Sequence, residues 1–466
     1  MNAIEQPWAP YEPSPREPWD LQKVGHLHRR AGFGANWAEL HRDLKAGPAE
    51  SIERLLHPTA EDRQFRQVAD ALKVSVSASS DGFVGMSGGD PRSARVWWLY
   101  RMAYGDDPLG ERLTLFWHNH FATALHGVYS LGLMLDQNEM LRKHARGKFG
   151  DLLTAVEADR AMLLWLDNGS NQKDHPNENF ARELLELFTL GVGNYTEADV
   201  RAAARGLTGW KQGEDNFFNK TNDFTYRDDL ADTGSKTFLR QTGPWRRPDV
   251  LRIVLAQPAA ARHVCRKLYR WFVGESELPS DDLIEPLAAE FRASDYSIEH
   301  VVGIILRSRH FFSQAAYRQR VKSPIEFVVG AVRQLEPPRS PNLLPLTDIC
   351  CEKQGQILFD PPSVKGWDGG AAWLDSNATL VRLNWIVELL SGNPSASVPA
   401  YKPEIWLKRH AIGPPEALDA FATLLMPGDV SPATNSLAHQ VLSVSSQTNL
   451  AASLQVLLQA PEYQLS

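Results

Sequence analysis

One predicted helix carries two carboxylates whose spacing suits chemistry. Residues 179–190 read Asn-Phe-Ala-Arg-Glu-Leu-Leu-Glu-Leu-Phe-Thr-Leu. At about 100° per residue, Asn179, Glu183 and Glu186 fall on one stripe, and the apolar side chains form the opposite face. Two carboxylates one turn apart can share a metal ion or divide the acid and base roles of a proton transfer. The alternative is an ordinary amphipathic helix with a solvated polar stripe.

A second predicted helix places polar groups among apolar ones. The apolar side chains of residues 109–125 point in nearly every direction, as in a buried helix. The same segment carries Glu111, His118 and His120, and buried polar groups need partners. Residues two apart differ by about 200° around a regular helix, so we expect only one of the two histidines to join a given site.

The two segments leave three alternatives open. If a metal binds, the economical ligand set is His118, Glu183 and Glu186, which is a mixed nitrogen and oxygen site suited to iron, manganese or zinc. Without a metal, His118 or His120 could form an acid–base network with the same glutamates and Arg182. The third reading is a pair of hydrogen-bonded core histidines that perform no chemistry.

Weaker signals predict contacts with a substrate. Lys236, together with Arg182, would hold an anionic group. Trp367 lies on a glycine-rich turn at residues 366–370, where an indole can either stack on a sugar or anchor the loop to the core. Acidic residues near position 230 could bind a cation, although a solvated loop is the simpler reading. The predicted substrate-binding residues are Asn179, Asp232, Lys236, Trp367 and Arg382.

Helical periodicity dominates the rest of the chain and predicts an all-α fold, a multi-helix globular bundle. A polar, aromatic stretch at residues 213–245 lacks this period and predicts loops or a short hairpin. We expect an extended arm over residues 1–20 and a helical core region over 21–212 that carries the His and Glu residues. A helical C-terminal region over 246–466 would pack on that core.

Composition bounds the partners and the location. The 466-residue chain has a formal net charge of -7, which argues against a nucleic-acid partner. The sequence contains no run of about 18 apolar residues, so it predicts no membrane span. The first 20 residues lack the apolar region of a secretory signal, and three cysteines make no disulfide framework. These features predict a cytoplasmic protein and leave export with a partner open.

Several of these segments together resemble one known family. Residues 116–123, Phe-Trp-His-Asn-His-Phe-Ala-Thr, and residues 176–191 resemble signatures of the uncharacterised bacterial family DUF1800. The resemblance continues at residues 30–34, 195–197, 208–210, 322–324 and 361–367, so it covers nearly the whole chain in order. It implies no settled reaction. Members often occur beside a sulfatase-like family of the alkaline-phosphatase superfamily, which implies a partner of that kind and, by association, anionic or glycan substrates.

The chain departs from the family pattern in the polar stretch. Similar sequences often read His-Asp-x-Gly-x-Lys, whereas residues 231–236 here read Ala-Asp-Thr-Gly-Ser-Lys. If that histidine were a ligand or a base, the activity of this chain would be altered.

Two hypotheses for function follow. In the first, the protein is a metal-assisted hydrolase or an oxidoreductase acting on an anionic or glycan-like substrate, with the histidines and glutamates as ligands or acid–base groups. It requires His118 or His120 within about 3 Å of Glu183 or Glu186, or linked to them by one ion, beside an open cleft. In the second, the protein is a non-catalytic binding partner or escort of a sulfatase-like protein. That hypothesis predicts sealed polar groups and an exposed apolar patch.

Overall fold

The computed structural model describes residues 7–59, 61–78, 90–216, 219–275, 277–339, 342–443 and 449–466 of the chain. Helices provide nearly all of the regular structure in these residues, and the only strands there form two small antiparallel hairpins. The predicted all-α fold is therefore confirmed. Among the described residues no helix has both the length and the apolar character needed to cross a membrane.

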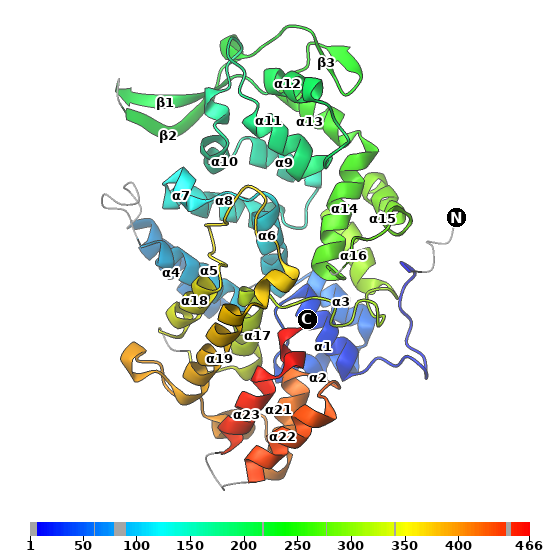
Figure 1. The fold of residues 1–466 in the computed structure, drawn as a ribbon, viewed down its shortest axis with the longest axis vertical. Coiled ribbons are helices and arrows are strands. Elements are labelled where there is room, and N and C mark those ends of the chain that lie inside the picture. Colours follow the sequence, from blue (N-terminus) through cyan, green and yellow to red (C-terminus); the bar gives the residue numbers. More distant parts are fainter. Residues whose placement is uncertain are drawn as a thin grey trace.

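The helices pack around two hydrophobic cores (Figure 1). The first core includes Trp98, Phe327 and Trp385. The helices that line mainly this core are α2 (Trp37–Ala46), α4 (Arg63–Ala78), α5 (Pro91–Tyr104), α7 (Leu125–Val128), α17 (Pro324–Leu335), α18 (Leu343–Lys353), α19 (Ser376–Ser391), α20 (Pro403–Arg409), α21 (Ala417–Leu425), α22 (Pro432–Ser443) and α23 (Asn449–Gln459).

The second core includes Phe149, Val254 and Leu268. Its helices are mainly α3 (Pro48–Leu56), α9 (Phe149–Glu157), α11 (Asn179–Glu183), α12 (Glu197–Gly206), α13 (Arg247–Leu255), α14 (Pro258–Phe272), α15 (Asp281–Ala293) and α16 (Ile298–Arg307). Four further helices give buried side chains to both cores: α1 (Leu21–Ala31), α6 (Pro108–His120), α8 (Leu131–His144) and α10 (Arg160–Trp165).

Helix α6 lies near the middle of the molecule, between the two cores (Figure 1). Leu115 packs in the first core, whereas Leu113 and Phe116 pack in the second. Contact with both cores explains why apolar side chains surround this helix. Its polar side chains other than Asn119 are buried, so they need partners on neighbouring elements.

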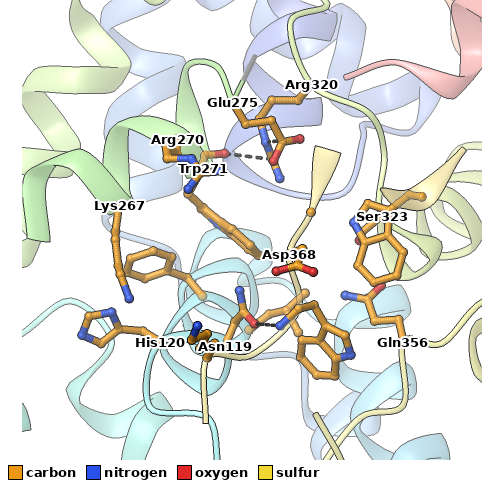
Figure 2. A pocket seen from close by; sticks show the side chains of 16 residues that line it. Asn119, His120, Lys267, Arg270, Trp271, Glu275, Arg320, Ser323, Gln356 and Asp368 are labelled. Carbon is orange, nitrogen blue, oxygen red and sulfur yellow. Dashed lines mark hydrogen bonds and ion pairs between the residues drawn. The ribbon is translucent and has the colours of Figure 1, made fainter. Parts of the chain in front are cut away.

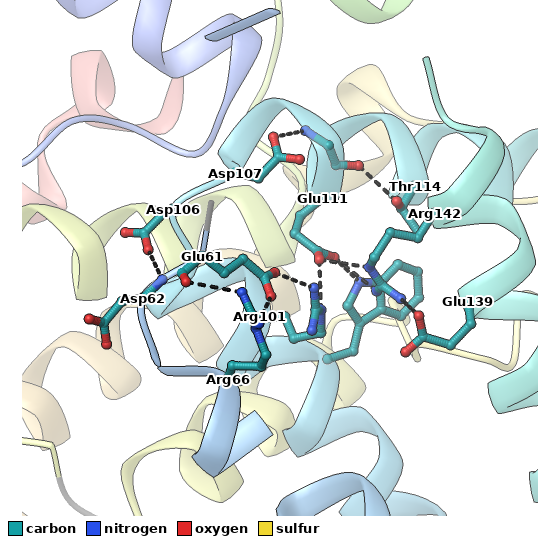
Figure 3. Close-up of polar contacts among 12 residues, drawn as sticks. Glu61, Asp62, Arg66, Arg101, Asp106, Asp107, Glu111, Thr114, Glu139 and Arg142 are labelled. Carbon is teal, nitrogen blue, oxygen red and sulfur yellow. Dashed lines mark hydrogen bonds and ion pairs between the residues drawn. The ribbon is translucent and has the colours of Figure 1, made fainter. Parts of the chain in front are cut away.

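Glu111 is the best-partnered of these buried groups (Figure 3). Its carboxylate accepts hydrogen bonds from Trp98 Nε1 at 2.9 Å, Arg101 Nε at 2.9 Å and Arg142 Nε at 2.8 Å. Burial alone would raise the pKa of Glu111, but the guanidiniums of Arg142 and Arg101 lower it to about 2. One carboxylate thus joins α5, α6 and α8.

Two hairpins occupy the polar insertion. Strand β1 (Trp210–Asn216) pairs antiparallel with β2 (Asn219–Tyr226), and β3 (Lys236–Phe238) pairs antiparallel with β4 (Gln241–Gly243). The hairpin alternative is therefore confirmed, although the first strand already begins at Trp210. Trp210 Nε1 donates to the buried carboxylate of Glu157 at 3.0 Å, which ties the first hairpin to α9.

Residues 7–20 lie on the body without forming a helix or strand. Trp8 is buried and its Nε1 donates to the Leu283 carbonyl at 2.7 Å, while Trp19 Nε1 donates to the Asp43 carbonyl at 3.0 Å. The two indoles therefore attach this segment to the helices.

We predict that Glu111→Gln lowers the free energy of unfolding by about 3 kcal/mol, because the loss of one charge leaves two guanidiniums without their buried counter-ion. Urea denaturation at neutral pH measures this change. Glu404→Gln, at an exposed glutamate on α20, serves as the matched control and should change stability little.

The same pair of variants has a pH signature. The pKa of Glu111 is lowered from 4.5 to about 2, so its stabilising effect is complete above pH 4.5 and is lost as the pH falls toward 2. The stability difference between the wild type and Glu111→Gln should shrink over this window. A difference that is constant down to pH 2 would contradict the assigned pairing.

Candidate functional site

The segment predicted as one regular helix over residues 179–190 changes its geometry halfway. Helix α11 (Asn179–Glu183) continues into a π-helical segment, η2 (Leu184–Thr189). The Leu190 amide donates to the Leu185 carbonyl, five residues back, at 2.9 Å. Short π-helical insertions occur frequently at functional sites.

The carbonyls at the end of η2 are bound by side chains from other helices. His120 Nε2, on α6, lies 3.0 Å from the Phe188 oxygen. From α14, His263 Nε2 and Lys267 Nζ both lie within hydrogen-bond distance of the Leu187 oxygen, at 2.9 and 3.0 Å. Basic side chains at a helix C-terminus satisfy its last carbonyls and suit its dipole. The π-helical end therefore positions side chains from both α6 and α14.

The contact with Phe188 determines the state of the His120 ring. A carbonyl can only accept, so Nε2 carries the proton and Nδ1 keeps its lone pair. Nδ1 is buried and has no hydrogen-bond partner. Burial, followed by the positive charge of Lys267, holds the pKa of His120 well below its usual range. His120 is thus a neutral imidazole with one unused acceptor.

His120 lies in the wall of a cavity of about 210 Å³ (Figure 2). The cavity forms where the two cores meet, since Trp271 in its wall packs against both. The described lining combines basic, acidic and tryptophan side chains, namely Lys267, Arg270, Arg320, Lys365, Glu275, Asp368, Trp271, Trp367 and Trp373. Such a mixture suits a small ligand that has both charged and flat apolar surfaces.

Not all of the cations in this wall are free. Arg320 is buried and pairs with Glu326 at 3.2 Å and with Glu275 at 3.4 Å. Burial would raise the pKa of Glu326, but Arg112 and Arg320 lower it to about 2. Arg320 is therefore already neutralised within the protein.

Lys267 differs from Arg320, because no carboxylate pairs with it in the described part of the chain. Burial and the neighbouring charge of Arg270 lower the pKa of Lys267 to about 8. Lys267 therefore brings to the cavity a positive charge that the protein does not neutralise.

A loop between α18 and α19 forms part of the cavity wall. Asn119 Oδ1, on α6, accepts from the Trp367 backbone N–H at 2.7 Å, and Trp367 Nε1 donates to the Gly355 carbonyl at 3.1 Å. Gly366 has a φ of 78°, and a Cβ atom there would overlap the Asn119 side-chain and carbonyl oxygens. Glycine is needed at this position for both reasons. The contact fixes the flanking Lys365 and Asp368 at the cavity.

The structure does not bring the predicted histidines and glutamates into contact. His118 Nε2 accepts from the Phe359 backbone N–H at 3.2 Å, and burial lowers the pKa of His118 to about 3. Glu186 accepts from the Tyr195 hydroxyl at 2.9 Å. Burial and the charge of Glu186 raise the pKa of Glu183. The charges of Arg182 and Lys365 act on Glu183 in the opposite sense, and Glu183 is not among the described residues that line the cavity.

The predicted metal set is likewise not assembled. Within the described ranges, no group of three or more His, Cys, Asp or Glu side chains is placed to hold a metal ion. His118, Glu183 and Glu186 thus do not fit iron, manganese or zinc in this geometry. His118 instead packs between Trp98 and Phe359, as expected for a core histidine.

Most of the predicted substrate contacts lie elsewhere. Arg182 pairs on the surface with Glu197 at 2.7 Å and with Glu178 at 3.1 Å. The Asn179 backbone N–H donates to Asn177, and its side chain lies in an exposed position. Among the predicted catalytic and substrate-binding residues, the cavity lining contains His120 and Trp367.

The other basic candidates stabilise the fold. Lys236 is buried and its Nζ donates to the carbonyls of Asp232 and Gly234 at 2.7 and 2.8 Å, so it closes its own loop. Arg382 is buried and donates to Gln354, Gln464 and the Lys322 carbonyl. Since both side chains use their donors internally, neither offers a contact to a ligand.

Sequence reasoning missed the contribution of α14. Lys267 and Trp271 line the cavity from one stripe of α14, whereas Glu275 lines it from just beyond the end of that helix. A cation and an indole four residues apart on one predicted helix were the available signal.

The comparisons with known proteins show the family of the chain. The family model described as "Protein of unknown function (DUF1800)" matches residues 26–465. The chain therefore belongs to this family. No curated protein and no solved structure matches it. Segments that carry the family resemblance meet in the cavity, where residues 116–123 provide Asn119 and His120, and residues 322–324 and 361–367 provide Ser323, Lys365 and Trp367.

We predict that Gly366→Ala costs more stability than Gly355→Ala. Both glycines have positive φ, at 78° and 83°, but a Cβ at Gly355 would meet nothing within 4 Å. The control variant should therefore show only the backbone strain of about 1–2 kcal/mol. Gly366→Ala should lose roughly a further 1–3 kcal/mol, because the loop must separate from Asn119.

Thermal or urea unfolding of the two variants measures this difference. Equal losses of stability would show that the close approach of Gly366 to Asn119 is not required.

Proposed function

We propose that the protein is an enzyme, a hydrolase that binds a small anionic, glycan-like substrate in this cavity and uses His120 for proton transfer. The contact of a histidine with Glu183 or Glu186, which the sequence hypothesis required, is not formed, so this proposal assigns no role to those glutamates. One observation carries the proposal. His120 is a neutral imidazole with an unpartnered Nδ1, in the wall of a basic, tryptophan-lined cavity. A buried acceptor without a partner is costly, and such groups concentrate where a ligand or a reaction uses them.

The surroundings of His120 suit the role of a general base. Its Nε2–H is held by the Phe188 carbonyl, so the ring orientation and the tautomer are fixed before substrate binds. Nδ1 would accept a proton from a water molecule or a substrate hydroxyl. The basic side chains of the wall would hold an anionic group, and the indoles would cover the apolar face of a sugar ring.

A metal ion has no role in this proposal. The chemistry of iron, manganese or zinc would require ligands that the described side chains do not bring together. We therefore derive the reaction from acid–base groups of the chain itself.

The non-catalytic hypothesis has one observation in its favour. Leu380 and Val387, seven residues apart on α19, are 57% and 39% exposed and lie on the same side of that helix. They would belong to a docking face if the protein escorts a sulfatase-like partner. That partner, and a cytoplasmic location or export with it, stay predictions from the sequence.

We predict that His120→Gln lowers kcat by about 100-fold or more on nitrophenyl glycosides that carry a carboxylate or sulfate group, because general acid–base groups contribute about 10²–10⁴ in rate. His118→Gln is the matched control. It also removes a buried histidine from α6, but it should lower the melting temperature rather than kcat.

Turnover is measured by nitrophenol release and folding by thermal denaturation. Unchanged turnover in His120→Gln would refute the proposed role of His120. Binding of these glycosides without any turnover would favour the non-catalytic hypothesis.

A further inference from the structure

We infer that the cavity has an anion-binding end, formed by Lys267 and Arg270, and a hydroxyl-binding end, formed by Asp368, Gln356 and Ser323. The cavity would therefore take a single sugar unit that carries one anionic group. This inference rests on the proposed function, because it assigns the substrate of the same cavity.

The first argument is the balance of charge. Arg320 is paired with Glu326 and Glu275. The other cations of the lining are Lys267, Arg270 and Lys365, and none of them forms an ion pair with a carboxylate within the described residues. Two of these, Lys267 and Arg270, lie one turn apart on α14. An anionic ligand group would supply the missing counter-charge there.

The second argument is the arrangement of the polar side chains (Figure 2). Lys267 lies with His120 on one side of the cavity, Ser323 and Gln356 lie on the other, and Asp368 lies between. The Asp368 carboxylate can accept hydrogen bonds from hydroxyl groups. Gln356 Oε1 accepts from the Ile325 N–H at 2.9 Å, which leaves its amide nitrogen as the group that can donate.

The third argument is size. A cavity of about 210 Å³ is smaller than the roughly 300–1,000 Å³ of typical sites for drug-sized ligands. One sugar ring with its substituents matches this volume better than an oligosaccharide or a peptide. Trp271 and Trp373 in the wall can cover the apolar face of such a ring.

The anion-binding end also bears on His120. The charge of Lys267 is one of the causes that keep His120 from accepting a proton, together with burial and His263. A ligand anion beside Lys267 would offset that charge and make His120 more basic. A neutral sugar would leave His120 a weak base. The arrangement thus favours anionic substrates in the chemical step as well as in binding.

Calorimetric titration of the full chain with glucuronate, glucose and inorganic phosphate tests the inference. We expect wild-type protein to bind glucuronate more tightly than either other probe. Lys267→Met should weaken glucuronate binding about tenfold or more, whereas Lys143→Met, at an exposed lysine of α8, should leave it unchanged.

The pH dependence provides a second readout that does not rely on the Met variant folding normally. With a pKa of about 8, Lys267 loses most of its charge between pH 7 and pH 9, so glucuronate affinity should fall about tenfold over this range. Lys267→Arg keeps its charge and should bind with little change. The ionisable groups that face Lys267 are His120, His263 and Arg270. Burial lowers the pKa of both histidines, that of His263 to about 4, so neither histidine titrates in this window.

Three outcomes would overturn the inference. These are equal glucuronate affinity in the wild type and Lys267→Met, no glucuronate binding to the wild type, and phosphate binding as tight as that of glucuronate. If any of these occurs while His120→Gln still abolishes turnover, the proposed function stands and only the substrate assignment fails.

Discussion

The packing of α6 between two hydrophobic cores is the constraint on which the other features of the site depend. Because both sides of this helix are buried, its polar side chains are bound by segments that are distant in the sequence. The partners come from four elements. Glu111 binds Arg142 of α8, Arg112 binds Glu326 of α17, and His120 binds the Phe188 carbonyl of η2. His118 and Asn119 bind the Phe359 and Trp367 amides, both in the loop between α18 and α19. The same contacts that satisfy α6 therefore bring the walls of the cavity together.

Charge pairing then determines which groups remain for a ligand. Arg112 and Arg320 pair with Glu326 and Glu275 beneath the cavity, where unpaired charges would cost several kcal/mol each. Lys267 has no such ion pair among the described residues. Its ammonium group donates to the Leu187 carbonyl at the end of η2, and its pKa is lowered to about 8. The positive charge of Lys267 therefore depends on pH near neutrality, which the charge of a residue in a buried ion pair would not.

Local patterns in the sequence predict the elements but not their long-range partners. Helical period predicts the all-α fold, and the all-round apolar character of residues 109–125 correctly predicts a buried helix that needs partners, although that helix ends at His120. The same geometry correctly separates His118 from His120. The helical periodicity of apolar residues cannot show that η2 departs from α-helical geometry. It also cannot show that α14 and the loop containing Trp367 meet α6, because these contacts depend on tertiary packing. Lys236 illustrates the converse error, because a local loop contact fully accounts for a motif that looked functional.

The π-helical turn η2 places an unusual demand on the length of the chain. Its hydrogen-bonded turns hold one residue more than α-helical turns, so deleting a single residue there would restore α-geometry and change which carbonyls are left outside the helical hydrogen bonds. His120, His263 and Lys267 would lose their anchors together. Side chains in this segment can be exchanged for others of similar size, whereas the number of residues cannot change. Natural variation within residues 184–189 should therefore take the form of substitutions and not of insertions or deletions.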